Sequence, residues 1–351
     1  GGVSLFVVAF AIYPIAKSMF QAADIPKRLI PGAIALGSFT FTMTALPGTP
    51  SIQNAIPIPY FGTNVFAAPG IGTISGLVMF GLGAMWLQSR ANKAQSKGEG
   101  YGVDTQESEK LIDGVTSQGH MPVLLALLPL LLVIGVNALF TYAIFPSVDF
   151  SNLKELYPKL EPAKQTGLWS LIIALVVACL SLILFRLGKW NNLKETVNKG
   201  VLGSMLPIFN TASEVGYGAV VASLAGFVVI RDMVLNVSSN PLVSEAVAMN
   251  VLAGITGSSS GGMSIALQTL GGDYLAMANA AGISPELLHR IAALAAGCLD
   301  TLPHSGAVIT LLAICGMTHK QSYGNVAMCT VVIPMVSVAV AITLGTVFGS
   351  F

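Results

Sequence analysis

Long apolar runs separated by short polar stretches recur along the whole chain. A membrane-spanning helix needs about 20 apolar residues, and residues 3–20 form the first candidate. Residues 29–89 contain no Asp, Glu, Lys or Arg, which leaves room for two crossings, one around Pro47 and one over 66–87. The further candidate spans are 121–145, 167–185, 203–230, 246–270, 291–317 and 323–348. The pattern predicts an all-α, polytopic membrane protein.

Basic residues indicate how these spans are oriented. If each full span crosses once, the Lys and Arg residues of 17–28, 90–120 and 186–199 fall on one side. The opposite loop, 147–165, carries as many acidic residues as lysines. Because cytoplasmic loops are enriched in Lys and Arg, we expect the first group to lie in the cytoplasm. The C-terminus then lies outside, provided that 246–270 enters and leaves the membrane on one side.

The composition agrees with a membrane location. Of the 351 residues, 54% are hydrophobic and 9% are charged, whereas a soluble domain has about 25% charged residues. The net charge of +1 comes without a basic stripe, which argues against nucleic-acid binding. The four cysteines lie in apolar stretches without a CxxC pair, so neither a disulfide framework nor a zinc site is predicted. We expect no cofactor and no resident metal.

Two stretches of the chain resemble each other. Residues 1–5 read Gly-Gly-Val-Ser-Leu, and 261–265 read Gly-Gly-Met-Ser-Ile. A Gly/Ala-rich segment follows each, and then Ala-Leu-Pro-Gly-Thr at 45–49 or Thr-Leu-Pro-His-Ser at 301–305. Inverted repeats are typical of secondary transporters with a midplane binding site, and chance similarity between Gly-rich segments is the alternative. The repeat also predicts that a hairpin arm precedes Gly1.

Residues 44–54 interrupt an uncharged membrane stretch. Pro47, Gly48 and Pro50 cannot continue a helix, and backbone groups freed inside a membrane must face protein or a water-filled cavity. Side-chain donors and acceptors gather at the same place. Together with Pro47 and Gly48, the predicted substrate-binding residues here are Thr44, Thr49, Ser51, Gln53 and Asn54. A kinked helix or an interfacial loop is the alternative.

A second interruption, residues 254–262, reads Gly-Ile-Thr-Gly-Ser-Ser-Ser-Gly-Gly between apolar arms. It predicts the tip of a re-entrant hairpin, with glycines in the turn. The substrate-binding residues predicted here are Ser258, Ser259, Ser260 and Gly261. The stretch also matches G-x-S-x-G, so a membrane-embedded hydrolase using Ser259 or Ser260 is an alternative. That motif needs a preceding strand and Asp and His partners, whereas the flanks here predict helices, and we therefore predict no catalytic residue.

A third interruption carries ionisable groups. Asp300 and His304 lie in the otherwise uncharged stretch 291–318, and a charge at the centre of a membrane helix costs about 2.5–3.5 kcal/mol on insertion scales. Helical spacing would bring the two side chains together. We predict that both couple proton or cation movement and that their neighbours Thr301, Pro303 and Ser305 bind substrate. A structural carboxylate cap at a broken helix end is the alternative.

A fourth predicted interruption, residues 210–218, contains Glu214, the single ionisable group between Lys199 and Arg231. It could relay protons, coordinate a cation or hold two helices together, and we predict a coupling role. By contrast, His120, His289 and His319 lie at segment ends, where we expect solvated, interfacial side chains.

Two absences narrow the function. There is no Walker A sequence, which argues against ATP-driven transport by this chain. Lys and Arg are missing from all four interruptions. Half-helix N-termini, each worth about half a positive charge, together with hydroxyl and amide donors, would therefore hold an anionic substrate. Two such ends match one carboxylate, which favours a small monoanion.

At these residues the chain resembles the gluconate permease family of proton symporters, within the wider ion transporter superfamily. The resemblance covers nearly the whole chain and is most specific at residues 45–54, 210–218, 257–262 and 300–306. It implies that two hairpin tips and two unwound helices form the substrate site, carried by an elevator-like motion. Residues 1–4 would be the remnant of the first tip. The motif Leu-Pro-Gly-Thr-Pro at 46–50 departs from the His-containing version associated with gluconate carriers.

The sequence thus predicts a secondary active transporter in a bacterial inner membrane. It would carry a small hydroxy- or keto-monocarboxylate, such as gluconate, glycerate or hydroxybutyrate, by proton symport. Sodium coupling and a passive channel are the alternatives within transport. The oligomeric state stays open between a monomer and a homodimer.

The predicted organisation has four parts. Residues 1–88 are the remainder of the first repeat, with a hairpin arm, a broken helix and a scaffold helix. Residues 89–120 are a cytoplasmic loop, 121–202 are scaffold helices and an amphipathic connector, and 203–351 are the second repeat, with its hairpin and broken helix.

Overall fold

The computed structural model of the protein describes residues 5–102, 123–157, 161–185 and 192–351, and this part is helical without β-strands. Within it, four helices are long and apolar enough to cross a membrane unaided. They are Pro69–Gln95, Leu127–Ser147, Gln165–Phe185 and His319–Phe348. The predicted all-α class is confirmed, and several other predicted spans are divided into shorter helices.

A run of short helices between two longer ones forms the N-terminal part. Its elements are α1 (Leu5–Ala22), η1 (Lys27–Leu29), α2 (Ile30–Ser38), α3 (Phe41–Thr44), α4 (Ile52–Ala55), α5 (Ile58–Phe61) and α6 (Pro69–Gln95). The short pieces coincide with the Pro- and Gly-rich stretch that was expected to break a helix. The unbroken α6 contains the span predicted at 66–87.

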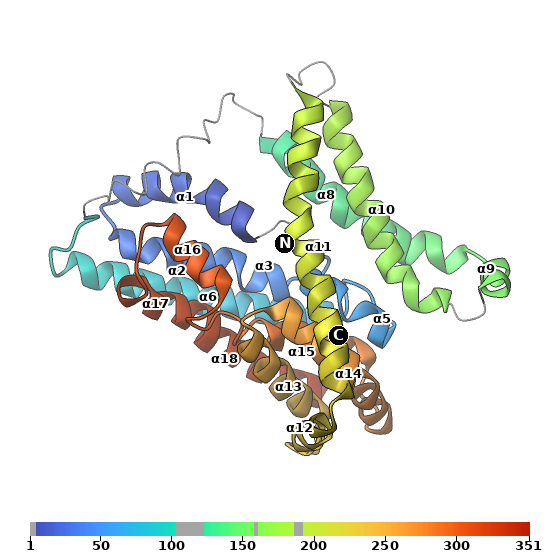
Figure 1. Ribbon diagram of the computed structural model, residues 1–351. Helices are drawn as coiled ribbons and strands as arrows, with labels where there is room; N and C mark the ends of the chain where they lie inside the picture. The colour runs from blue at the N-terminus through green and yellow to red at the C-terminus, as the bar shows by residue number, and fades with distance from the viewer. Residues whose placement is uncertain (1–4, 103–122, 158–160, 186–191) are drawn as a thin grey trace.

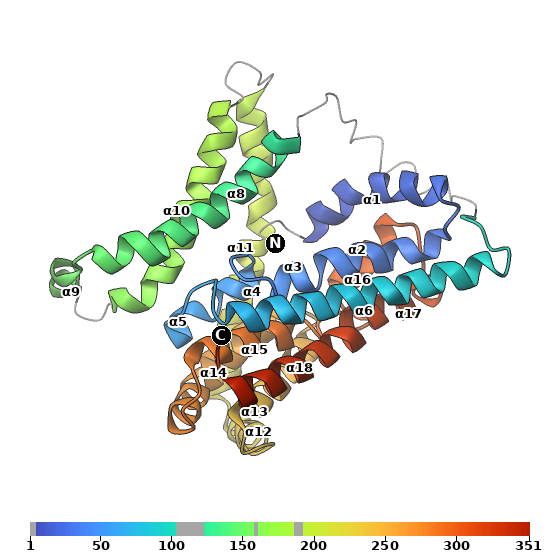
Figure 2. The same cartoon turned by 180° about the vertical axis from the view of Figure 1, so that it is seen from behind.

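The middle of the chain forms an antiparallel helical pair that projects from the remaining helices (Figures 1 and 2). Its elements are α8 (Val123–Leu139), η2 (Phe140–Ile144), η3 (Phe145–Ser147), α9 (Ser151–Leu156) and α10 (Pro162–Phe185). Val133 of α8 packs between Ala174 and Ala178 of α10. The pair contacts the N-terminal part where Leu171 packs on Ile58 of α5.

The span predicted at 203–230 is two helices. They are α11 (Leu193–Ser223) and α12 (Ala225–Leu235), separated at Leu224, whose backbone is extended. Arg231 of α12 is held by Asp273, with nitrogen–oxygen distances of 2.9 and 2.6 Å.

The C-terminal part repeats the alternation of long and broken helices. Its elements are α13 (Pro241–Thr256), α14 (Ser259–Ala280), α15 (Pro285–Ala296), α16 (Gly306–Ile314), α17 (His319–Ala327), η4 (Met328–Val332) and α18 (Ile333–Phe348). α13 and α14 form a hairpin, and α15 and α16 are separated by an irregular segment. The C-terminal Phe351 lies beside the start of α6, where its carbonyl oxygen accepts a hydrogen bond from Gly70 N at 2.8 Å.

Helix α15 lies at the centre of the core. All residues from Leu287 to Ala296 are buried, and they pack with apolar residues of α6, α13, α14 and α18. α6 and α18 also contact each other directly, because Ser337 Oγ donates to Ser75 O at 3.0 Å. Since α15 is buried on every side, any polar group on it must find its partners inside the protein.

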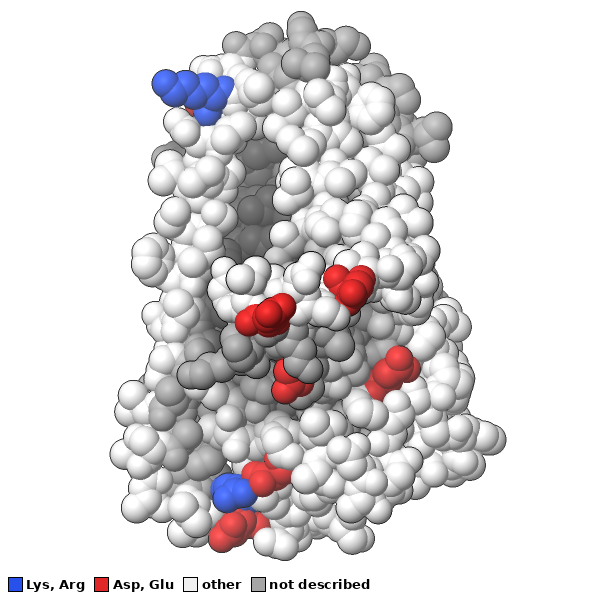
Figure 3. Space-filling model, turned by 90° about the vertical axis from the view of Figure 1, so that its right-hand side faces the viewer, with Lys and Arg blue, Asp and Glu red and all other residues white. Residues whose placement is uncertain are grey.

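The surface fits a lipid environment. Large apolar side chains are exposed on α8, α10 and α11, including Leu131 (55% exposed), Leu184 (61%) and Leu202 (71%). Figure 3 shows a face on which charged side chains stand in a few separate places between broad uncharged areas. Apolar exposure on this scale marks a surface that meets another apolar phase.

The α13–α14 hairpin is closed by a glycine contact. A Cβ added at Gly262 would lie 2.3 Å from the backbone nitrogen of Ala253, so the arms approach this closely only because position 262 has no side chain. Gly272, also on α14, has nothing within 4 Å of such a Cβ.

We therefore expect Gly262→Ala to destabilise the protein, because the added methyl group forces the hairpin arms apart. Overpacking of this kind costs about 1–3 kcal/mol, which should lower the melting temperature of the purified protein. Gly272→Ala is the control and should leave the melting temperature unchanged or slightly raised, since alanine favours a helix. Equal effects of the two substitutions would contradict this account of the hairpin.

Candidate substrate site

The first break covers residues 45–51, between α3 and α4. Pro47 and Pro50 have no backbone N–H to continue a helix. Gly48 adopts a φ of +77°, which glycine tolerates without strain. The interruption therefore falls at the residues whose chemistry requires it.

Side chains in and beside the first break bind carbonyl groups in and around it. Asn54 Nδ2 donates to Thr49 O at 3.1 Å and to Val65 O at 2.9 Å, and Ser51 Oγ donates to Met43 O at 2.6 Å. The hydroxyl groups of Thr44 and Thr49 donate in the same way to Thr40 O and Leu46 O. These side chains maintain the shape of the break.

The hairpin tip lies between α13 and α14. Gly257 turns the chain with a φ of +64°. Ser258 then caps α14, with its Oγ accepting from Gly261 N at 3.1 Å, and the Oγ atoms of Ser258 and Ser260 are 3.3 Å apart. The positive N-terminal end of α14 therefore lies at the tip.

The second break, residues 297–305, is bound to this tip. Ser305 Oγ donates to Gly257 O at 2.9 Å, and His304 Nε2 is 3.0 Å from Gly254 O. Pro303 and His304 are exposed at the surface of the chain.

Thr301 and Asp300 of the second break have other contacts than Ser305 and His304. Thr301 Oγ1 is 2.7 Å from Thr330 Oγ1 of η4. Because the segment consists of turns and not of helix, Asp300 and His304 are not stacked as helical spacing would place them. Each of them contacts the hairpin separately.

The two breaks and the hairpin tip meet in the interior. Gln53 Nε2 donates to Ser259 Oγ at 2.7 Å, across 206 residues of sequence. The Ser259 side chain in turn interacts with the Asp300 carboxyl group. At the start of the breaks, a Cβ added to Gly297 would lie 2.6 Å from Thr44 Cγ2. Three segments singled out from the sequence thus form one polar junction beside α4, α14 and α15 (Figure 2).

This junction is enclosed. Gln53, Ser259 and Asp300 are between 5% and 7% exposed. Asp300 Oδ1 has no hydrogen-bond partner, although it is a strong acceptor. The junction therefore has unused capacity to bind a proton or a polar ligand.

Glu214 lies in α11, but its side chain, like Gly1–Ser4 and His120, lies outside what the structure describes. Its predicted coupling role therefore stays a prediction. His319 is exposed, as expected, with Nε2 at 2.9 Å from Pro303 O.

The structure corrects the expectation that His289 is solvated at an interface. His289 and its neighbour Arg290 are both fully buried on α15. His289 Nδ1 is 2.6 Å from Thr63 Oγ1, and His289 Nε2 is 3.3 Å from Asn54 Oδ1. The error has a simple cause, because position 289 follows a polar loop in sequence but the tertiary fold covers this end of α15 on every side.

Arg290 stabilises the first break through hydrogen bonds from its buried guanidinium group. Its Nε and Nη2 donate to Ala67 O at 3.0 and 2.8 Å, its Nη1 donates to Asn54 Oδ1 at 3.0 Å, and its Nη2 donates to Val65 O at 3.3 Å. Sequence reasoning missed this residue because the four interruptions themselves contain no Lys or Arg. The sequence did contain a signal, because Arg290 is the only Lys or Arg between Arg231 and Lys320.

The buried guanidinium also changes the electrostatics of the site. Arginine stays charged in proteins, and none of the described carboxylates lies within hydrogen-bonding distance of Arg290. A positive charge without a paired carboxylate therefore lies directly behind Asn54. This corrects the inference that helix ends and hydroxyl groups alone supply positive potential here.

A second missed group is Glu245, in the first turns of α13. The side chain is fully buried, and neither carboxylate oxygen has a hydrogen-bond partner. The Tyr274 hydroxyl group of α14 donates to the carbonyl group of Ser244, the residue before Glu245, at 3.2 Å. Glu245 directly precedes the span predicted at 246–270, so it is not among the ionisable groups that lie inside predicted spans.

Taken together, the fold and the junction define an all-helical membrane protein whose interrupted helices meet at an enclosed polar site. The chain is 46% identical over 346 residues to YxjC of Bacillus subtilis (strain 168), an uncharacterized transporter, and the match covers 94% of this chain and 72% of YxjC. The chain belongs to the same family of transporters as YxjC. No family model and no solved structure matches the chain.

We expect Arg290→Met to destabilise the protein strongly. The Ala67 carbonyl group would lose both of its hydrogen bonds from Arg290, whereas the Val65 carbonyl group keeps those from Asn54 and Gly48. A buried unsatisfied group costs about 1–3 kcal/mol. The free energy of unfolding should therefore fall by about 3 kcal/mol, seen as a lower melting temperature. Arg231→Met is the matched control, because it breaks only a part-exposed ion pair, worth about 1 kcal/mol or less. A loss no larger than that of the control would exclude the structural role of Arg290.

Proposed function

We propose that this transporter is a secondary active carrier of small hydroxy- or keto-monocarboxylates, of the type found in the gluconate permease family, and that it moves its substrate together with protons. The observation that carries the proposal is the contact from Gln53 to Ser259 and on to Asp300. This contact joins both broken helices to the hairpin tip, which are the parts from which such carriers build their binding site.

The order of the elements supports an inverted repeat. α1 and α2 are joined at the end of the molecule where α6 finishes, because Arg28 binds Glu99 just beyond α6. α14 and α15 are joined at the opposite end, where Glu286 contacts Ser350 close to the start of α6. Each pair is followed by a broken segment and then by a long helix, and these last helices, α6 and α18, pack together.

The electrostatics of the junction favour an anion. The N-terminal end of the 22-residue α14 lies at the tip, and α16 begins at Gly306, directly after Ser305. Each helix end contributes about half a positive charge, and the buried Arg290 adds to this potential. No lysine or arginine side chain is hydrogen-bonded to Gln53, Ser259 or Asp300 among the described residues. The two helix ends together match about one carboxylate, and the donors of Arg290 are already bonded to Ala67, Val65 and Asn54.

Asp300 is the proposed proton-binding group. An ionised carboxylate in this enclosed place, with one oxygen unpaired, costs desolvation free energy. Binding a proton when the anion binds would remove one charge from the complex that crosses the membrane, and so lower the barrier. His304 and Glu214 remain further candidates for coupling.

Movement in this proposal is elevator-like, in a bacterial plasma membrane. The pair α8 and α10 projects from the helices that carry the junction (Figure 1), as a scaffold beside a moving unit would. Exposed leucines on this pair provide a surface for lipid or for a second copy of the chain.

The test is uptake into proteoliposomes under a proton gradient or a sodium gradient, imposed separately, with gluconate, glycerate and hydroxybutyrate as substrates. We expect accumulation under the proton gradient. In the Asp300→Asn variant, pH-driven accumulation should fall at least about tenfold, because an amide cannot exchange a proton, while exchange of internal for external substrate continues in part. Asp232→Asn, which removes an exposed carboxylate, should behave like the unchanged protein.

Other outcomes would overturn parts of the proposal. Accumulation driven by sodium alone would replace proton coupling, and downhill flux without accumulation would indicate a channel. Unchanged accumulation in Asp300→Asn would exclude that residue. Labelling of Ser259 or Ser260 by a fluorophosphonate would favour the hydrolase alternative, although neither serine is hydrogen-bonded to a histidine among the described residues.

A double-mutant cycle tests the junction itself. Gln53→Ala and Ser259→Ala should each raise the substrate concentration for half-maximal uptake about tenfold. Because the two side chains form one contact, the double variant should be little worse than either single variant, as expected for residues that act together. Ser223→Ala, on the exposed end of α11, is the control. Additive losses would show that the two residues act independently, which contradicts a shared site.

A further inference from the structure

A group of basic side chains lies at the C-terminal end of α6 and includes none of the junction residues. Arg90, Lys93 and Lys97 follow one another at intervals of three and four residues, so they lie along one side of the helix. Trp86 lies one turn earlier on the same side, and the Arg90 guanidinium lies 5.6 Å from its ring centre. The charge distribution predicts that this end of α6 is cytoplasmic.

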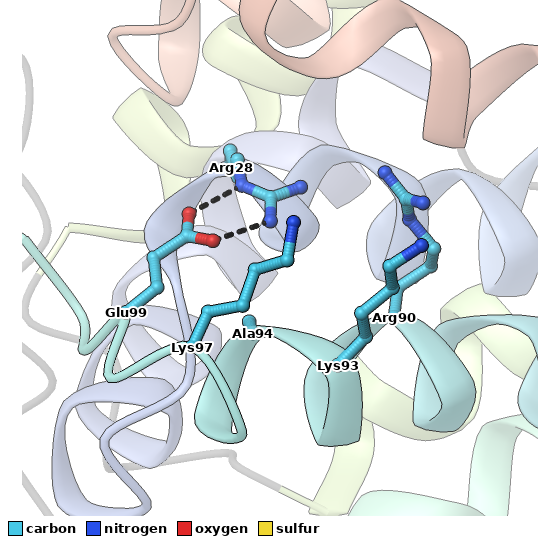
Figure 4. Close-up of a pocket in the computed structure, with 6 residues that line it drawn as sticks. All are labelled: Arg28, Arg90, Lys93, Ala94, Lys97 and Glu99. Atoms are coloured by element: carbon cyan, nitrogen blue, oxygen red, sulfur yellow. Dashed lines mark hydrogen bonds and ion pairs between the residues drawn. The ribbon is translucent and has the colours of Figure 1, made fainter.

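The chain beyond α6 folds back and completes a pocket. Gly98 adopts a φ of +69°, and Glu99 N then donates to Ala94 O at 3.0 Å. This turn brings Glu99 to Arg28, which it binds through two contacts of 2.6 and 2.7 Å. Figure 4 shows the four basic side chains pointing into the space between α6 and the turn that carries Arg28. The cavity has a volume of about 130 Å³.

The pocket has an excess of positive charge. The hydrogen bonds from Arg28 hold the pKa of the Glu99 carboxyl below its usual value, so this ion pair is neutral overall. Arg90, Lys93 and Lys97 have no acidic partner within ion-pair distance among the described residues. Arg90 Nε is buried and has no hydrogen-bond acceptor. Three like charges in one cavity repel each other, and an anion between them would remove both the repulsion and the unpaired donor.

We propose that the pocket formed by Arg28, Arg90, Lys93 and Lys97 binds a phosphate group. An oxyanion with several acceptor oxygens can bind the Arg90 donor and both ammonium groups at once, whereas a single carboxylate has fewer acceptors. The phosphate can belong to an anionic lipid headgroup, because basic pockets between helices on the cytoplasmic side bind such headgroups. It can also be free phosphate from the cytoplasm.

The experiment compares the full chain with the double variant Lys93→Gln/Lys97→Gln, which keeps the Arg28–Glu99 pair. The control is Lys194→Gln/Lys199→Gln, which removes the same charge from exposed positions on α11. One arm measures the melting temperature in potassium phosphate against potassium chloride at equal ionic strength. The other arm uses nanodiscs of phosphatidylglycerol or phosphatidylcholine and counts the lipids retained by native mass spectrometry.

We expect the unchanged protein and the control to bind the phosphate group, and the pocket variant to bind it about tenfold more weakly. Retention of phosphatidylglycerol without a shift in inorganic phosphate assigns the site to lipid. A rise in melting temperature with inorganic phosphate, as binding linkage requires, assigns it to the free anion. Binding in neither arm, or equal loss in the pocket variant and the control, overturns the proposal. Transport activity is not the readout, so this result is independent of the proposed function.

Discussion

The structure depends on how the backbone groups of broken helices are satisfied. Lipid offers no hydrogen bonds, so a chain that interrupts a helix inside a membrane must supply partners from its own side chains. At the first break, Asn54 and Ser51 bind carbonyl groups of the segment itself. Arg290, from a helix more than 200 residues away, binds the carbonyl groups of Ala67 and Val65. The break is therefore a rigid feature held by charge-assisted hydrogen bonds.

The same requirement explains why the second break lies against the hairpin tip. Gly254 and Gly257 have carbonyl groups at the end of α13 that no helical N–H reaches. His304 and Ser305 are hydrogen-bonded to these carbonyl groups, and these bonds hold the second break at the tip. Close approach is possible because residues at the contacts are small, as at Gly257, where an added Cβ would lie 3.3 Å from Ser305 Cα. Interfaces between membrane helices generally use small residues in this way.

The buried ionisable groups have different surroundings. In the described part of the chain, the buried ionisable groups include Glu245, Arg290 and Asp300, and they do different things. Arg290 is fully bonded and supports the fold, whereas Glu245 and Asp300 retain unpaired oxygens. Unpaired buried carboxyl groups are costly to ionise, which makes them suited to carrying protons and explains why Asp300, at the junction, is central to the proposed coupling. Glu245 lies outside the junction, and the structure gives it no partner.

The sequence determined the helical class, the membrane location and the breaks at 45–51, 257–258 and 297–305, because these follow from local properties: apolar run length, charge content, glycine turns, and the missing N–H of Pro47 and Pro50. It did not determine the break at Leu224, and α11 runs unbroken through the interruption predicted at 210–218. The sequence also singled out Gln53, Ser259 and Asp300, each separately, as candidate site residues. Their meeting, and the positions of His289 and Arg290 behind the first break, were decided only by the tertiary structure. Contacts such as Gln53 to Ser259 span 206 residues, and no local pattern encodes which distant side chain will fill a given space. A residue such as His289 next to a loop in sequence becomes buried because other helices pack over it, and that packing is a property of the whole fold.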